Sequence, residues 1–176
     1  MLNNSIKSNG IITKEAGVSI GLATARLLGG NTIEDNGGSG VEVVQGALFQ
    51  GLGSWDFPPN PDIISSNGNR GIFGWNGARL EIRKVTVMNN GTDGIQVGFH
   101  SSIMLSGSTI ADNTEHGISV VNGSAINLEP PTGTTNAVIT GNSWYGVFCV
   151  DEESSLTGGT TGVYGNGVGQ VQCTGF

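Results

Sequence analysis

The sequence predicts an all-β solenoid of about seven coils, each of roughly 23 residues and three short strands. Three observations predict it. An Ile/Val-x-x-Asn pattern recurs seven times, and apolar residues alternate with period two after a recurring glycine. The 31 glycines, spread along all 176 residues, are the third, because they divide the chain into segments too short for long helices. We expect residues 1–176 to form one domain, which can be a piece of a longer protein.

The first strand of each coil ends at the asparagine of the repeated pattern. These residues are Asn9, Asn36, Asn67, Asn90, Asn113, Asn142 and Asn166. Their spacings are 27, 31, 23, 23, 29 and 24 residues. We expect the asparagines to adopt left-handed backbone angles in a turn, which this residue type tolerates. We also expect their side chains to hydrogen-bond to one another along the stack.

The second strand follows a glycine four residues after most of these asparagines. The segments Gly94-Ile95-Gln96-Val97 and Gly117-Ile118-Ser119-Val120 show the pattern, with apolar residues at alternate positions. Such alternation is typical of a strand. A second apolar pair, such as Leu80/Ile82 or Ile103/Leu105, predicts the third strand. No apolar stripe of period 3.6 accompanies the repeats, which argues against a helical array.

One coil cannot fold alone. Burying about five apolar side chains gains on the order of 10 kcal/mol. Ordering about 23 residues costs roughly 1–2 kcal/mol for each residue. Stacked coils share hydrogen bonds and a continuous core, so we expect the repeats to be stable only as an array.

These motifs resemble the repeats of right-handed parallel β-helix proteins, the pectin-lyase-like superfamily, over nearly the whole chain. The resemblance implies a single-stranded right-handed parallel β-helix. It implies less about function, because this superfamily includes polysaccharide lyases, hydrolases, uronate epimerases, phage tailspikes and secreted proteins of unknown role.

Composition excludes several partners. Lys and Arg total 7 against 14 Asp and Glu, a net charge of −7. Nucleic acid and anionic membranes are therefore not expected partners. The chain contains no apolar run long enough for a membrane span and no signal-peptide segment at its start. Either the chain is cytosolic or a signal or larger segment precedes it, and with the resemblance we expect an extracellular or cell-surface protein.

The strand that follows the glycine presents the strongest candidate site. Its outward side chains should form columns across the coils, with Phe73, Trp75 and Gln96 among them. Just before the glycine, Arg70, Asp93, His116 and Tyr145 fall on successive coils, with Glu115 and Trp144 one position earlier. Aromatic platforms with polar neighbours are typical of carbohydrate sites, so we predict that Phe73, Trp75, Gln96, Tyr145 and Trp144 bind ligand.

The same column supports a catalytic alternative. An aspartate and a histidine stacked at strand spacing can form an acid/base pair, with Asp93, His116, Glu115 and Arg70 as candidates. The simpler interpretation is a polar ladder of compensating charges. The calcium-ligand set, aspartate cluster and Asp-Pro-His triple that the superfamily's enzymes imply are not found. The acidic run Asp151–Glu153 falls in a turn, so calcium is possible but not indicated, and no cofactor is expected.

Two coils carry insertions that leave the same edge. Gly40 to Gly71 spans 31 residues and Gly117 to Gly146 spans 29, against 23 for regular coils. Both are either tolerated surface loops or the walls of a shallow groove. In the second case Trp55 would form one wall and Arg83 would lie between the insertions, so both are candidate ligand-binding residues.

Cys149 and Cys173 are 24 residues apart and should occupy the same inward position of adjacent coils. They form either a disulfide, which implies an oxidising compartment, or two free core thiols. A metal site is not expected, since no histidine accompanies them.

The sequence starts within a coil and stops after a strand, so we expect either a fragment or a homo-oligomer that pairs through its open ends. Our leading prediction is a non-catalytic secreted or surface module that binds carbohydrate or acts as a rigid scaffold. The alternatives are a polysaccharide lyase or hydrolase and a fragment of a tailspike-like adhesin.

Overall fold

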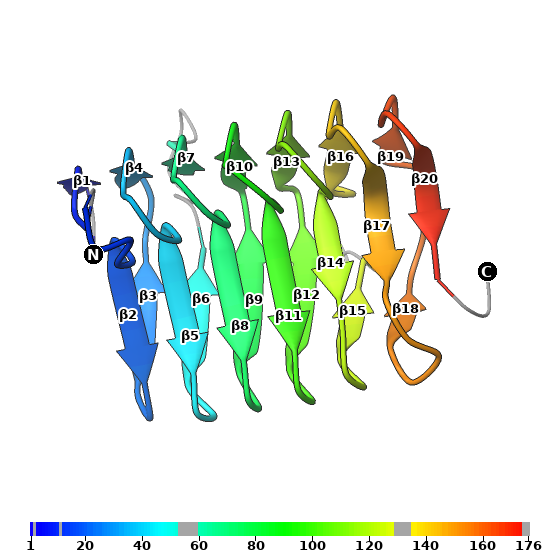
Figure 1. Ribbon diagram of the computed structural model, residues 1–176, viewed down its shortest axis with the longest axis horizontal. Coiled ribbons are helices and arrows are strands. Elements are labelled where there is room, and N and C mark those ends of the chain that lie inside the picture. The colour runs from blue at the N-terminus through cyan, green and yellow to red at the C-terminus, as the bar shows by residue number, and fades with distance from the viewer. Residues whose placement is uncertain (2, 11, 53–59, 129–134, 174–176) are drawn as a thin grey trace.

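In the computed structural model, which describes residues 1, 3–10, 12–52, 60–128 and 135–173, the chain winds through three parallel sheets in turn. Each coil contributes one strand to sheet A and one to sheet B, and in the described residues the first six coils also contribute one to sheet C. Equivalent strands of adjacent coils pair in parallel. Figure 1 shows the coils succeeding one another along the long axis, from the N-terminal strand in blue to the C-terminal strand in red. This is a single-stranded parallel β-helix, as the repeats predict.

Sheet A contains β1 (Ser5–Lys7), β4 (Thr32–Glu34), β7 (Asp62–Ser65), β10 (Val85–Met88), β13 (Thr109–Ala111), β16 (Val138–Thr140) and β19 (Val163–Tyr164). Sheet B contains β2 (Val18–Gly21), β5 (Val41–Val44), β8 (Ile72–Trp75), β11 (Ile95–Gly98), β14 (Ile118–Val120), β17 (Tyr145–Cys149) and β20 (Gly169–Gln172). Sheet C contains β3 (Thr24–Leu27), β6 (Leu48–Gly51), β9 (Arg79–Arg83), β12 (Ser102–Ser106), β15 (Ala125–Asn127) and β18 (Ser155–Thr157).

The interior is a continuous apolar core formed by alternate residues of all three sheets. On β11, for example, Ile95 and Val97 are fully buried while Gln96 between them faces outward. The equivalent inward residues of neighbouring coils stack in register, such as Ile95 between Ile72 and Ile118. This stacking supplies the burial that a lone coil lacks.

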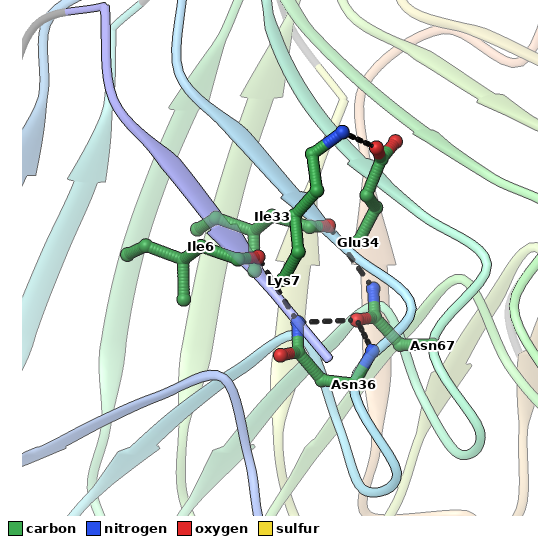
Figure 2. Close-up of polar contacts among 6 residues, drawn as sticks. All are labelled: Ile6, Lys7, Ile33, Glu34, Asn36 and Asn67. Carbon is green, nitrogen blue, oxygen red and sulfur yellow. Dashed lines mark hydrogen bonds and ion pairs between the residues drawn. The ribbon is translucent and has the colours of Figure 1, made fainter. Parts of the chain in front are cut away.

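The seven asparagines form a hydrogen-bonded ladder, which confirms the predicted side-chain stack. Asn36 donates from its side-chain Nδ2 and its backbone N–H to Oδ1 of Asn67, and Asn67 does the same toward Asn90. Figure 2 shows that Nδ2 of Asn36 also lies against the carbonyl of Ile6 on the previous coil, to which it donates. Each ladder asparagine thereby joins backbone groups of neighbouring coils.

The predicted left-handed angle at these asparagines is wrong. The positive φ falls on the residue before each one, such as Asp35 at 56° and Asp112 at 54°. The ladder asparagine itself continues into the turn with its side chain directed inward, because its amide contacts the backbone of the preceding coil and the asparagine side chain of the next coil.

The same ladder explains why each repeat contains a glycine. A Cβ at Gly94 would lie 2.7 Å from Nδ2 of Asn113 and 2.7 Å from the carbonyl oxygen of Gly117. Only a residue without a side chain lets the next coil's asparagine approach so closely. The glycine and the Ile/Val-x-x-Asn pattern are therefore two halves of one packing contact.

Candidate functional site

The outer face of sheet B carries the predicted columns of side chains. In register, the outward residues of successive strands are Ser19, Glu42, Phe73, Gln96, Ser119 and Phe148. Phe73, Gln96 and Phe148 are partly exposed, whereas Ser119 is buried. The period-two alternation of each strand sets this order, because the intervening residues fill the core.

Trp75, which ends β8, lies over the outer side of Gly98 on the next coil. A Cβ at Gly98 would point outward and fall 2.2 Å from Cζ3 and 2.6 Å from Cε3 of the indole. The two residues are register partners, so the indole leans along the long axis onto the bare glycine. Trp75 stays partly exposed. The glycine thus lets an aromatic platform rest on the sheet.

Two phenylalanines flank this platform. The ring centroids of Phe73 and Trp75 lie 5.1 Å apart with planes inclined by 30°, so Phe73 extends the platform. Phe99 lies 4.5 Å from Trp75 at 58° and forms a raised wall. The guanidinium of Arg70 sits 4.8 Å above the Phe73 ring, a cation–π contact.

Sequence reasoning missed both Gly98 and Phe99. The signal for Gly98 was a glycine directly after Trp75 in a column that otherwise holds Gly21, Val44 and Val121. The signal for Phe99 was a bulky apolar residue in a turn, where it follows the strand directly.

The column of Arg70, Asp93, His116 and Tyr145 is present as predicted. The carbonyls of these residues accept hydrogen bonds from the glycines of successive coils, as from Gly71 N–H to Asp93. The carboxylate of Asp93 accepts the backbone N–H of His116 at 3.2 Å. Nδ1 of His116 in turn accepts the backbone N–H of Tyr145 at 3.3 Å. Within this column, the side chains of Asp93 and His116 each accept a backbone N–H of the next coil.

Burial sets the ionisation of this pair. Asp93 is 3% exposed and His116 6% exposed. Burial raises the pKa of Asp93 to about 7, and the negative charge of Glu115 raises it further. The hydrogen bond from the His116 backbone and the positive charge of Arg70 lower this pKa, but by less. Burial also lowers the pKa of His116. Both groups are therefore biased toward their neutral forms, and Nδ1 of a neutral His116 is free to accept.

A second aromatic group surrounds His116. Its ring stacks on Phe148 at 4.5 Å and 6°, lies 6.0 Å from Tyr145 at 24°, and meets Trp144 edge-on at 5.3 Å. The ring of Tyr145 in turn covers Gly169 on the next coil. The rings in this group stack mostly on one another. A ligand could therefore contact mainly their edges and the half-exposed Trp144.

Glu115 and Trp144 are neighbours on adjacent coils, because Trp144 N–H donates to the carbonyl of Glu115. The structure therefore brings Asp93, Glu115 and His116 into one region. The described contacts of Asp93 and His116 are made with backbone groups and aromatic rings. A catalytic role for these residues stays a prediction.

One comparison with known proteins identifies the family. The model of a family described as the right-handed β-helix region matches residues 1–166. The chain belongs to this family. No curated protein and no solved structure matches it. The family match supports the predicted fold, including its hand, and specifies no ligand or activity.

The two insertions of this β-helix leave the same edge, between sheets C and A, as predicted. One separates β6 from β7 and the other separates β15 from β16. Between them lies an open depression of about 490 Å³, lined by Pro61, Lys84, Val85, Thr86, Gly107, Thr109 and Thr135. Arg83 ends β9 at this edge, beside its register partner Ser106. Two buried atoms there, Nε of Arg83 and Oγ of Ser106, have no hydrogen-bond partner among the described residues. Trp55 lies outside the described residues.

Cys149 and Cys173 are joined by a disulfide between adjacent coils of the β-helix, with Cα atoms 4.7 Å apart. This decides between the two alternatives that the sequence left open. The bond links the end of β17 to the residue that follows β20.

Asp151, in the acidic run, closes a turn. Its carboxylate accepts the backbone N–H groups of Asn122, Gly123 and Ser154. Burial by itself would raise the pKa of Asp151, but these hydrogen bonds outweigh it and lower the pKa. Among the residues that the structure describes, no group of three or more His, Cys, Asp or Glu side chains is arranged to hold a metal ion. No helix in the described ranges is long and apolar enough to cross a membrane.

Proposed function

We propose that this β-helix is a non-catalytic, secreted or surface module that binds carbohydrate on the outer face of sheet B. The observation that carries the proposal is the Trp75 indole resting over Gly98, with Phe73 extending it. The apolar C–H face of a sugar ring stacks on such a platform, while hydroxyl groups need nearby polar partners. Gln96 and Arg70 supply those partners from neighbouring coils.

The spacing of the aromatic groups suits a chain of sugars. Phe73, Gln96, Ser119 and Phe148 follow one another on consecutive coils. At about 4.8 Å between strands, the two phenylalanines are roughly 14 Å apart. A polysaccharide running along the long axis can therefore contact the Trp75 platform at one point and the edge of the His116 group at another.

The disulfide supports the proposed location. Structural disulfides persist mainly in oxidising compartments, such as the extracellular space. The Cys149–Cys173 bond therefore favours a secreted or surface protein over a cytosolic one.

Binding to a polysaccharide panel, measured by calorimetry, tests the proposal. Trp75→Ala should weaken binding at least about tenfold, equivalent to about 1.4 kcal/mol. Tyr164→Ala is the matched control, because Tyr164 is 53% exposed but lies on β19 of sheet A. This control should bind as the unaltered protein does. Equal binding by the Trp75→Ala variant would contradict the proposal.

A polysaccharide lyase or hydrolase is the second candidate. The observation in its favour is the pKa of about 7 for Asp93, a value suited to general acid/base catalysis, in a column with His116. The same incubations should be assayed for new reducing or unsaturated ends. Ends that appear with the unaltered protein and disappear with Asp93→Asn would establish the enzyme and replace the binding proposal.

A further inference from the structure

The Phe99–His100 turn differs from the equivalent turns of other coils. In four coils, the connection from sheet B to sheet C begins with two residues at positive φ. These pairs are Gln45–Gly46, Asn76–Gly77, Phe99–His100 and Asn122–Gly123. Three of them end in glycine, which adopts this conformation without strain. The fourth places two large side chains there, Phe99 at 52° and His100 at 58°.

A left-handed pair of bulky residues is disfavoured, so something else must favour these side chains at this position. Folding does not require them, because the asparagine–glycine turns on both sides make the same connection. Nor is Phe99 placed in the core, since 45% of it is exposed. Strain of this kind concentrates at sites where a side chain contacts a ligand.

Phe99 turns the Trp75 platform into a corner. Its ring stands at 58° to the indole with the centroids 4.5 Å apart, whereas Phe73 lies closer to parallel with the indole, at 30° and 5.1 Å. A sugar stacked on Trp75 would therefore direct one edge at an apolar wall. That wall leaves a hydroxyl group without a hydrogen-bond partner but packs well against a methyl group.

We propose that the Trp75–Phe99 corner selects a sugar that carries a methyl group, from either an N-acetyl substituent or a 6-deoxy position. This inference rests on the proposed carbohydrate-binding function and names its ligand class. Phe99 is the residue that determines the specificity, and Trp75 provides the affinity that all sugars share.

The test is the double variant Phe99→Asn/His100→Gly, which copies the Asn76–Gly77 turn of the preceding coil. The probes are chitotetraose, a fucosylated oligosaccharide and cellotetraose, which has no methyl group. We expect the unaltered protein to bind at least one methyl-bearing probe about fivefold or more tightly than cellotetraose. The two methyl-bearing probes distinguish an N-acetyl from a 6-deoxy source. The double variant should keep its affinity for cellotetraose and lose the preference.

The same variant tests the strain independently of binding. Its midpoint temperature of unfolding, Tm, should rise by about 3 °C as the left-handed turn is relieved. Gln45→Asn, in an equivalent turn that already ends in glycine, should change neither the preference nor the Tm appreciably.

Four results would overturn the inference. A double variant that keeps the preference would show that Phe99 does not set it, while a continued loss of binding in Trp75→Ala would leave the proposed function intact. A double variant with a lower Tm would show that the turn is not strained. An unaltered protein that binds cellotetraose best would refute the ligand class alone. No binding by the unaltered protein to any sugar would refute the proposed function as well.

Discussion

Replacing Asn113 with alanine should destabilise the protein far more than its small size suggests. Asn113 is fully buried at the middle of the ladder. Its Oδ1 accepts the backbone N–H of Asn90 at 3.1 Å and Nδ2 of Asn90 at 3.0 Å. Its Nδ2 donates to Oδ1 of Asn142 at 2.8 Å and approaches the carbonyl of Val87 at 3.5 Å.

The magnitude follows from the groups that are left without partners. In Asn113→Ala, the backbone N–H of Asn90 loses its acceptor, and Nδ2 of Asn90 keeps only its longer bond to the carbonyl of Ile64. The carbonyl of Val87 loses the Nδ2 donor of residue 113. Oδ1 of Asn142 keeps the backbone N–H of residue 113. Each buried group without a partner costs about 1–3 kcal/mol, so we expect a loss of roughly 3–5 kcal/mol in the free energy of unfolding. For a chain of this length, that loss lowers the Tm by about 10 °C.

Urea denaturation followed by circular dichroism measures the loss, and hydrogen exchange at the Asn90 amide locates it. Asn136→Ala is the control, because Asn136 is exposed and its side chain donates to Oγ1 of Thr161, which is not a ladder residue. That substitution should cost less than about 0.5 kcal/mol. If the two substitutions cost the same, or if the Asn90 amide stays protected, the ladder does not hold the coils together and the reasoning fails.

Three further predictions concern the site and the end of the array. Gly98→Ala should displace the Trp75 indole and weaken sugar binding about tenfold, as measured by calorimetry. Gly21→Ala is the control, because Gly21 lies in the same column but a Cβ added there would have its nearest neighbours at 3.5 Å or more. Equal binding by the two variants would contradict the role of Gly98. Replacing Cys149 and Cys173 with serine should lower the free energy of unfolding by about 3 kcal/mol for a separation of 24 residues, as measured by denaturation; an unchanged value would contradict a stapling role. Burial raises the pKa of Asp93 from 3.8 to about 7, so the destabilisation by its buried charge is absent below pH 4, grows between about pH 4 and pH 7, and is complete above pH 7. Asp93→Asn should therefore be more stable than the unaltered protein by about 2–4 kcal/mol at pH 8 and not at pH 4; equal stability at both pH values would mean that Asp93 is not penalised by burial.

The opposite shift of His116 does not disturb this last comparison. Burial lowers the pKa of His116, so its penalty appears as the pH falls below 6.5. Asp93→Asn and the unaltered protein share that histidine, and the difference between them isolates the carboxyl group.

The repeats by themselves determined the fold. Strand order, inward and outward faces, the asparagine ladder, the position of both insertions and the placement of Cys149 and Cys173 at equivalent positions of adjacent coils all follow from one register. The reason is that every coil contacts only its neighbours, so local patterns specify the whole array. The prediction at the ladder asparagines was wrong because it used residue type alone, which suggested a left-handed backbone angle at the asparagine. The hydrogen bonds of the ladder fix the asparagine itself, and the left-handed angle falls on the residue before it.

Only the tertiary structure decided how the outward residues are used. The sequence predicted that Trp75, Asp93 and His116 lie on one face, but it did not predict the direction of their side chains. Trp75 turns outward over Gly98 because that glycine offers no Cβ, whereas Asp93 and His116 turn onto backbone N–H groups of the next coil. These side-chain directions depend on which atoms of the adjacent coil lie within contact distance. The alternating pattern within one strand does not specify those atoms.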